Sequence, residues 1–256
     1  MSLAKEQLET FAEQGHLTVT GLLSEADVDK ATSDAMAWAN ETLGNITPMD
    51  EHWYLDAGAT GRHLRKLDDP VHYRAIFKAL ARTPLLVQAV EQLIGGHGGT
   101  VYFSQIFFKP PEGGGPKPIH QDNFYFGPSD PDGMVTAWIA LDDATIENGC
   151  LYYGDGSHKS GLIDHIAPQD EPFNLQLPAE AAASANMTAT PVARGGISFH
   201  HGITLHGSGD NNSSKWRRAV AFHYVRNDVT FPGLDIRSRN GGTHILISHA
   251  NKDVTL

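Results

Sequence analysis

The spacing and type of the apolar residues change near Thr100, and this change constrains the fold more than any other feature. Before it, apolar residues recur at helical spacing, first around Leu8 and Phe11 and then after a capping pattern that begins at Ser24. After it, runs rich in β-branched and aromatic residues are bounded by Gly, Pro, Asn and Asp, as strands are. Three runs are predicted as strands: 100–109, 134–141 and 216–225. Helices followed by short strands indicate an α+β chain, with helices packed outside a β-sandwich or barrel.

Nothing in the sequence divides the chain into separate domains. It has 256 residues, and it shows no internal repeat, no low-complexity tract and no composition typical of a linker. We therefore expect a single domain over 1–256. Its three parts are a mainly helical N-terminal part, a β core and a C-terminal extension: 1–98, 99–230 and 231–256.

The charge, the single cysteine and the lack of long apolar runs indicate which partners and which compartment to expect. The net charge of -11 and the pI near 5.6 argue against nucleic acid or an anionic membrane, because both require a basic surface. The one cysteine, Cys150, allows no intramolecular disulfide. The N-terminus shows no signal peptide, and no run reaches the roughly 18 apolar residues of a membrane span. We therefore expect a cytoplasmic protein without membrane or nucleic-acid partners.

A His-x-Asp pair, His120 and Asp122, is the first candidate for a metal site. On a strand, residues two apart point to the same face, so both side chains could converge on one ion. The same tripeptide also fits a solvated edge aspartate beside a hydrogen-bonded histidine. A metal site needs a third ligand, and His200 and His201 do not offer a pair, because neighbours on a strand point to opposite faces.

His206 is the candidate for the third ligand. It ends a predicted strand, a Gly/Asn/Ser turn follows, and Arg217 opens the next strand. A hairpin centred on that turn would place His206 opposite Arg217, within cross-strand reach. A slip of the register by one residue would bring Arg218 there instead, and Arg217 is equally compatible with a surface salt bridge.

Alternation along the strand favours Arg217 over Arg218 as a buried cation. The face that carries Arg217 continues with Ala219, Ala221 and His223, which are mostly small and leave room for a bound molecule. The opposite face carries larger residues, suited to packing against the helices: Val220, Phe222 and Tyr224. A buried arginine binds a carboxylate through two parallel hydrogen bonds.

Two histidines and one carboxylate leave three positions open on an octahedral metal, which is the facial arrangement of non-heme Fe(II) oxygenases. A 2-oxo acid can fill two of these positions and O2 the third. The far carboxylate of such an acid needs a cation deep in the pocket, and Arg217 could supply it.

Longer stretches around these residues resemble the phytanoyl-CoA dioxygenase family, in particular its smaller domain-containing members. The matching stretches have the order and spacing of the family: "FFKPPEGGGPKPIHQDNFYF", "AWIALDDATIENGCLYYGDGSHKSG" and "LHGSGDNNSSKWRRA". With the similar opening "FAEQGHLTVTGLLSEADV", the resemblance covers about residues 8–228. It implies a double-stranded β-helix, the cupin-like jelly roll, over 99–230, and it implies that this core holds Fe(II).

The resemblance also implies roles for individual residues. It implies an iron-binding set: His120, Asp122 and His206. It implies that Arg217 pairs with the C5 carboxylate of 2-oxoglutarate. Three further residues match positions that contact or surround this cosubstrate in family members: Ser208, Trp138 and Gln105. A basic residue before the core has a similar role in some members, and either Arg65 or Lys66 could correspond to it.

The predicted function is a dioxygenase reaction that uses Fe(II), 2-oxoglutarate and O2, oxidises an unactivated C–H bond of a small molecule, and releases succinate and CO2. Hydroxylation is favoured over halogenation by Asp122, because the halogenating relatives lack this carboxylate and chloride binds the iron in its place. Two alternatives remain: a jelly-roll metalloenzyme that uses a divalent ion as a Lewis acid, such as an isomerase or hydrolase, and a jelly-roll binding protein without catalysis.

The substrate is not identified by the sequence. Asn123 and Tyr125 follow the proposed ligands directly and are candidates to contact it. Two connections could form a lid, 110–118 and 158–184. Lys117 could meet an anionic group, although a solvated loop lysine is the more common case. The sequence is compatible with a monomer and with a homodimer.

Overall fold

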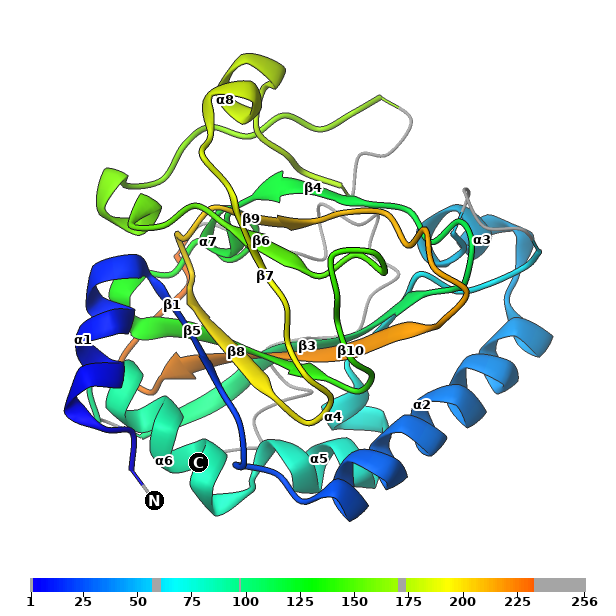
Figure 1. Ribbon diagram of the computed structural model, residues 1–256, viewed down its shortest axis with the longest axis horizontal. Coiled ribbons are helices and arrows are strands. Elements are labelled where there is room, and N and C mark those ends of the chain that lie inside the picture. Colours follow the sequence, from blue (N-terminus) through cyan, green and yellow to red (C-terminus); the bar gives the residue numbers. More distant parts are fainter. Residues whose placement is uncertain (1, 57–60, 97, 170–173, 233–256) are drawn as a thin grey trace.

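The computed structural model describes residues 2–56, 61–96, 98–169 and 174–232 (Figure 1). The predicted C-terminal extension, 231–256, lies almost entirely outside the described residues. The α-helices are α1 (Lys5–Gln14), α2 (Glu25–Asn45), α3 (Pro48–Tyr54), α4 (Pro70–Tyr73), α5 (Ala75–Ala81), α6 (Pro84–Leu93), α7 (Asp122–Phe126) and α8 (Ala179–Ser184). The strands are β1 (His16–Val19), β2 (Lys66–Asp68), β3 (Gly99–Lys109), β4 (Lys117–His120), β5 (Met134–Ala140), β6 (Leu151–Tyr153), β7 (Thr188–Thr190), β8 (Ile197–His201), β9 (His206–Ser208) and β10 (Arg217–Arg226).

Two antiparallel sheets face each other and form the predicted jelly-roll core. The large sheet has the strand order β1-β8-β5-β10-β3-β2, and the small sheet has the order β4-β9-β6-β7. Helices α2, α5 and α6 cover the face of the large sheet that is turned away from the small sheet (Figure 1). The molecule is therefore three layers deep, with the helices on one side and the small sheet on the other.

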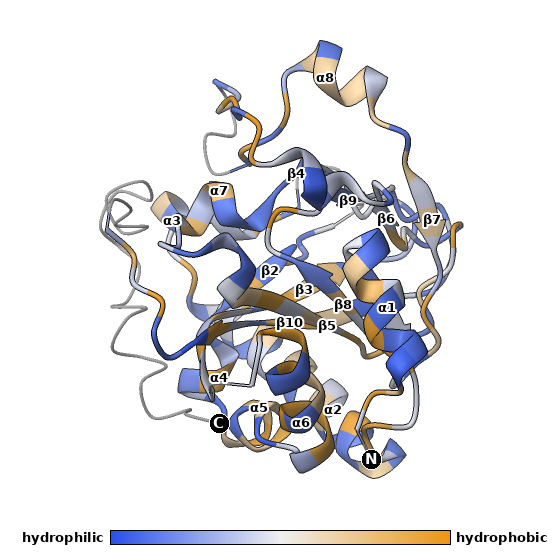
Figure 2. Cartoon of the chain, turned by 90° about the vertical axis from the view of Figure 1, so that its left-hand side faces the viewer, coloured by the Kyte–Doolittle hydropathy of each residue, from blue (hydrophilic) through white to orange (hydrophobic). Residues whose placement is uncertain are grey.

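Alternation along β10 explains how the layers pack. Val220, Phe222 and Tyr224 belong to the apolar core between the large sheet and the helices, as predicted. Ala219 and Ala221 belong to a separate apolar cluster between the two sheets. In Figure 2, β10 and its neighbours β3 and β5 are mostly coloured as hydrophobic, in keeping with burial on both faces. The small residues of the inner face leave space between the sheets.

The first helix contains the predicted Leu8 and Phe11, and the second begins directly after Ser24, as the capping pattern predicted. α1 ends at Gly15, which has a φ of 78° and donates its N–H to the carbonyl of Phe11. α2 is capped by Ser24, whose side chain accepts a hydrogen bond from the N–H of Asp27. The part over 1–98 is mainly helical, but it also contributes β1 and β2 to the two edges of the large sheet.

β9 and β10 do not form the predicted hairpin. β9 pairs with β4 and β6 in the small sheet, whereas β10 pairs with β3 and β5 in the large one. Arg217 consequently lies opposite Lys109, not opposite His206. The connection crosses between the sheets, and the Asn211 amide fixes it by donating to the carbonyls of Lys109 and Pro110 at 3.1 and 2.9 Å. The prediction was wrong because a short turn usually joins neighbours in one sheet, and this one joins two layers.

None of the helices in the described ranges is both long and apolar enough to cross a membrane.

Candidate metal centre

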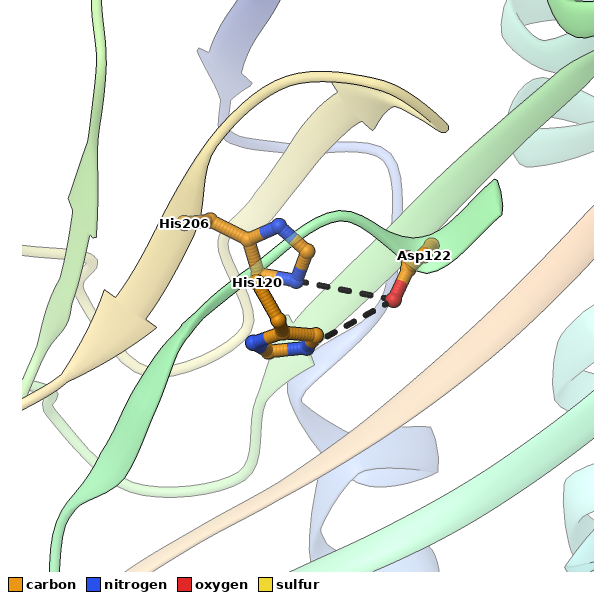
Figure 3. A group of neighbouring side chains, drawn as sticks. All are labelled: His120, Asp122 and His206. Atoms are coloured by element: carbon orange, nitrogen blue, oxygen red, sulfur yellow. Dashed lines mark ion pairs between the residues drawn. The ribbon is translucent and has the colours of Figure 1, made fainter. Parts of the chain in front are cut away.

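The three predicted metal ligands meet between the two sheets (Figure 3). His120 ends β4, His206 opens β9, and Asp122 begins α7. One ligand atom from each residue lies within 4.8 Å of the other two. The Nε2 atoms of His120 and His206 lie 3.7 and 3.6 Å from Oδ1 of Asp122. All three side chains are buried.

The pairing of β4 with β9 places the two histidines side by side. His120 and His206 are partners in the register, and their ring centroids are 4.1 Å apart. Nδ1 of His120 contacts the carbonyl of Pro118 at 2.8 Å, and Nδ1 of His206 contacts the carbonyl of Thr204 at 3.0 Å. A carbonyl only accepts, so each Nδ1 carries the proton and each Nε2 presents a lone pair toward Asp122.

Asp122 reaches the histidines from a helix and not, as the sequence predicted, from the same strand as His120. β4 ends at His120 and the chain turns at the fully buried Gln121. The Gln121 amide fixes this turn by donating to the carbonyls of Gly161 and Ile203 at 2.9 and 2.7 Å. The two-residue spacing therefore brings the ligands together through a break in the strand and not through strand alternation.

The electrostatics of the three residues suit a metal cation. Burial lowers the pKa of His120 well below the usual value, and it lowers the pKa of His206 as well, so both imidazoles are neutral near pH 7. Burial alone would raise the pKa of Asp122, but His206, His223 and a hydrogen bond from His200 hold it well below its usual range. Two neutral imidazoles and one ionised carboxylate are the donor set that a divalent transition metal requires.

Sequence reasoning missed a group of residues around the second carboxylate oxygen. Oδ2 of Asp122 accepts a hydrogen bond from the Thr136 hydroxyl at 2.6 Å and lies 3.0 Å from Nε2 of His200. Nδ1 of His223 lies 2.8 Å from the Thr136 oxygen and 3.3 Å from the same Oδ2. Strand alternation gave one signal, because it predicted His223 on the same face as Arg217, and both line the cavity. His200 and His201 face opposite ways, and His201 contacts Asp132 instead.

Arg217 is a buried cation in the same cavity as the three ligands. The residue is 3% exposed, and its guanidinium lies 5.5 Å from the centroid of the Trp138 ring. Among the described residues it has no hydrogen-bond or ion-pair partner, and its Nε is buried without one. Arg218, on the opposite face, instead pairs with Asp142 at 2.6 Å. Burial lowers the pKa of Arg217 to about 10, so the group is charged at neutral pH.

The cavity has a volume of about 1160 Å³ and gathers most of the predicted site residues. The lining includes all three predicted cosubstrate residues: Ser208, Trp138 and Gln105. Gln105 donates its amide to Asp68 at 2.7 Å, and Lys66 pairs with the same carboxylate at 3.1 Å. Arg65 and Lys66 both line the cavity, so the structure does not choose between them as the second cosubstrate cation.

The two predicted substrate residues lie in different environments. Tyr125 lines the cavity, and its ring meets that of His120 edge-on at 5.7 Å. Asn123 is buried and is not part of the described lining. Its amide donates to the carbonyl of Pro131 at 3.1 Å, and its side chain packs where a Cβ on Gly202 would stand.

Lys117 is not the solvated loop lysine that the sequence favoured. It opens β4, lines the cavity, and donates to the Tyr125 hydroxyl at 3.0 Å and to Oδ1 of Asn174 at 2.5 Å. Lys109 is also buried: its Nζ donates to the carbonyl of Gly115 at 2.7 Å and to that of Gly209. Burial, together with the charge of Arg217, lowers the pKa of Lys109 to about 6.

Comparison with known proteins gives consistent matches. The family model described as phytanoyl-CoA dioxygenase (PhyH) matches residues 11–219. A phytanoyl-CoA dioxygenase of Arabidopsis thaliana is 27% identical, with 89% of this chain and 90% of that protein covered. Phytanoyl-CoA dioxygenase domain-containing protein 1 of Rattus norvegicus is 35% identical over 64% of this chain and 58% of its own length. Among solved structures, the non-heme alpha ketoglutarate dependent carbocyclase SnoK from nogalamycin biosynthesis is 26% identical, with a TM-score of 0.70 and coverage of 91% and 88%.

Proposed function

The chain belongs to the phytanoyl-CoA dioxygenase family and is a 2-oxoglutarate-dependent non-heme iron dioxygenase (EC 1.14.11.-), and we propose that it hydroxylates an unactivated C–H bond of an organic molecule. Succinate and CO2 are the expected coproducts. One observation is the main support for this proposal. Arg217, a buried cation without a partner among the described residues, shares its cavity with the His-Asp-His triad.

Each predicted ligand contributes one atom to the proposed iron site. Nε2 of His120, Nε2 of His206 and Oδ1 of Asp122 face one another and would hold the metal on one side. When bound, iron and 2-oxoglutarate would supply the activation of O2 that oxidation of a C–H bond requires. The side chains of the protein do not need to act as a general base in this chemistry. Their role is to hold the ligands, orient the cosubstrate and exclude water.

Arg217 is the proposed partner of the C5 carboxylate of 2-oxoglutarate. A buried guanidinium without a counter-ion is costly, and a carboxylate relieves that cost through two charge-assisted hydrogen bonds. Ser208 lines the same cavity and can add a hydroxyl, while Trp138 lies beside the guanidinium. The triad comes from the small sheet and α7, and Arg217 comes from the large sheet, so the cosubstrate would span the space between the sheets.

The cavity supports an organic substrate larger than the cosubstrate itself. Its volume of about 1160 Å³ exceeds the range of roughly 300–1000 Å³ found for most sites that take drug-sized ligands. Six Phe, Tyr and Trp residues contribute to its wall: Phe103, Phe107, Phe108, Tyr125, Phe126 and Trp138. We propose a substrate with an extended apolar body that reaches the metal past Tyr125. Because both sheets build this cavity, we further propose that 1–256 works as one domain.

The two alternative functions have less support. A Lewis-acid metalloenzyme does not require a buried arginine such as Arg217, which has no counter-ion among the described residues. A binding protein without catalysis has no need of three metal ligands whose protonation states already suit a cation. The hypothesis of hydroxylation rests on Asp122, which fills the position that chloride would need on the metal.

The test measures succinate release and O2 uptake by the full chain with Fe(II) and 2-oxoglutarate, with and without a panel of apolar organic acids and polycyclic compounds. We expect slow succinate release without substrate and a coupled increase with an accepted compound, whose product gains one oxygen atom by mass spectrometry. No succinate release under any condition, together with no binding of 2-oxoglutarate, would overturn the proposal. A product that gains no oxygen would replace hydroxylation by another oxidation, such as desaturation or ring closure.

A further inference from the structure

The two oxygens of the Asp122 carboxylate have different surroundings. Oδ1 faces Nε2 of His120 and of His206. Oδ2 is directed to the large sheet, where Thr136 on β5 and His200 on β8 contact it at 2.6 and 3.0 Å. These two strands are direct neighbours in the sheet, and Thr136 and His200 are partners in their register. The carboxylate is therefore oriented from outside the set of metal ligands.

A chain of hydrogen bonds fixes the proton on His200. The Tyr153 hydroxyl lies 3.0 Å from Nδ1 of His200 and 3.0 Å from the Ser198 hydroxyl. Thr18 on β1 donates in turn to Ser198 at 3.2 Å. An ionised Asp122 only accepts, so Nε2 of His200 carries the proton and Nδ1 accepts from Tyr153. Every donor in this chain thus points toward the carboxylate.

The hydroxyl of Thr136 is fixed in the same way. It donates to Oδ2 of Asp122, and its oxygen accepts from Nδ1 of His223 at 2.8 Å. His223 is itself held between Phe126 and Phe103, with ring centroids at 4.9 and 5.8 Å. Rotation of the Asp122 carboxylate would break the short bond to Thr136 and the bond to His200 together.

We propose that Thr136 and His200 are positioning residues that keep Asp122 a one-oxygen ligand, through Oδ1 alone. This inference rests on the proposed function and deepens it. A carboxylate with a free second oxygen can bind a metal through both oxygens and would then occupy one of the three positions that the cosubstrate and O2 require. The hydrogen bonds to Oδ2 remove that option, and they hold Oδ1 where the two imidazoles point.

The test uses the metal-free full chain with Mn(II) as the probe. Thr136→Val keeps the shape of the side chain and removes the hydroxyl, and we expect the Mn(II) dissociation constant to rise about 10- to 100-fold. His200→Phe keeps an aromatic ring and should have an effect of the same size. Thr136→Ser restores the hydroxyl and should bind Mn(II) within about threefold of the wild type. Thr32→Val, which removes a hydroxyl bonded to a carbonyl within α2, is the matched control.

A second readout reports how the carboxylate binds. In the Co(II)-loaded protein, a second carboxylate oxygen on the octahedral metal would take one of the positions that 2-oxoglutarate requires. We therefore expect weaker 2-oxoglutarate binding by the Co(II)-loaded Thr136→Val and His200→Phe variants, and no such change in Thr136→Ser. Thermal unfolding of the metal-free variants shows whether each is folded. If Thr136→Val is not folded, the comparison of Mn(II) and 2-oxoglutarate binding between Thr136→Ser and His200→Phe still tests the positioning role.

The outcomes separate this inference from the function on which it rests. If Thr136→Val binds Mn(II) and 2-oxoglutarate as the wild type does, the positioning role is wrong and the dioxygenase function stands. If only His200→Phe loses Mn(II), His200 is a ligand and the positioning role is again wrong. A wild-type protein that binds neither Mn(II) nor 2-oxoglutarate would overturn the proposed function itself.

Discussion

Replacing Arg217 by methionine should stabilise the protein without its cosubstrate and abolish tight cosubstrate binding. Burial lowers the pKa of Arg217 to about 10, from an ordinary value above 12. At 1.36 kcal/mol for each pKa unit, the charged guanidinium destabilises the folded state by about 3 kcal/mol. The cation–π contact with Trp138 offsets about 1 kcal/mol of this destabilisation. Arg217→Met should therefore raise the free energy of unfolding by about 1–2 kcal/mol, and the melting temperature by roughly 2–8 °C.

The affinity for 2-oxoglutarate should change in the opposite sense. Removing one partner of a buried, hydrogen-bonded charge pair costs about 3–5 kcal/mol, because the other charge is left without compensation. For a cosubstrate carboxylate this corresponds to a dissociation constant raised roughly 100- to 4000-fold. The combination of higher stability with lost binding is the result that a purely structural arginine would not give.

Two measurements check both halves of this prediction. Thermal unfolding of the metal-free protein gives the change in stability, and calorimetric titration of 2-oxoglutarate into the Mn(II)-loaded protein gives the affinity. Arg218→Met is the matched control: Arg218 lies on the opposite face and pairs with Asp142 outside the cavity, so its loss should lower the stability and leave the affinity unchanged. An Arg217→Met variant that is less stable than the wild type and binds 2-oxoglutarate normally would refute the reasoning.

Two further predictions follow from the site and its surroundings. His206→Ala should bind Mn(II) at least about 100-fold more weakly and lose succinate release, as measured by calorimetry and turnover; full activity would remove His206 from the ligand set. Lys109 has a pKa of about 6 when folded and about 10 when unfolded, so the unfolded chain binds more protons between these values and the free energy of unfolding rises with pH. This contribution is complete above pH 10 and is lost as the pH falls to about 6. Urea unfolding at pH 7, 8 and 9 should show that the free energy of unfolding rises less steeply with pH in Lys109→Met than in the wild type, by up to about 1 kcal/mol per pH unit.

Alternation within a strand was enough to predict which side chains of β10 face which layer. The period of two is a local property of the backbone, so it holds wherever the strand itself is correctly identified. It placed Arg217 and Ala221 on the cavity side and Val220 on the helix side, as the structure has them. It also separated His200 from His201 correctly.

The errors concern what joins the strands. The predicted hairpin assumed that β9 and β10 are neighbours, but in this fold the turn after Ser208 leads to the other sheet. The predicted strand through Asp122 assumed that β4 continues, but the amide of Gln121 bonds to distant carbonyls and the chain turns into α7. Partners 40 and 82 residues away decide that turn, so no local pattern could have revealed it.

The same dependence on partners far away in the sequence explains why the hydrogen bonds to Asp122 from Thr136 and His200 were missed. It also explains why these bonds matter. Thr136 and His200 lie in the large sheet, whereas the histidine ligands lie in the small one. Asp122 sits between them, with one oxygen toward each sheet. A metal held by Oδ1 therefore links the small sheet to the large one through this carboxylate. Because a ligand that binds only the folded state stabilises it, metal binding should strengthen the packing of one sheet on the other, and the geometry of the iron site depends on that packing.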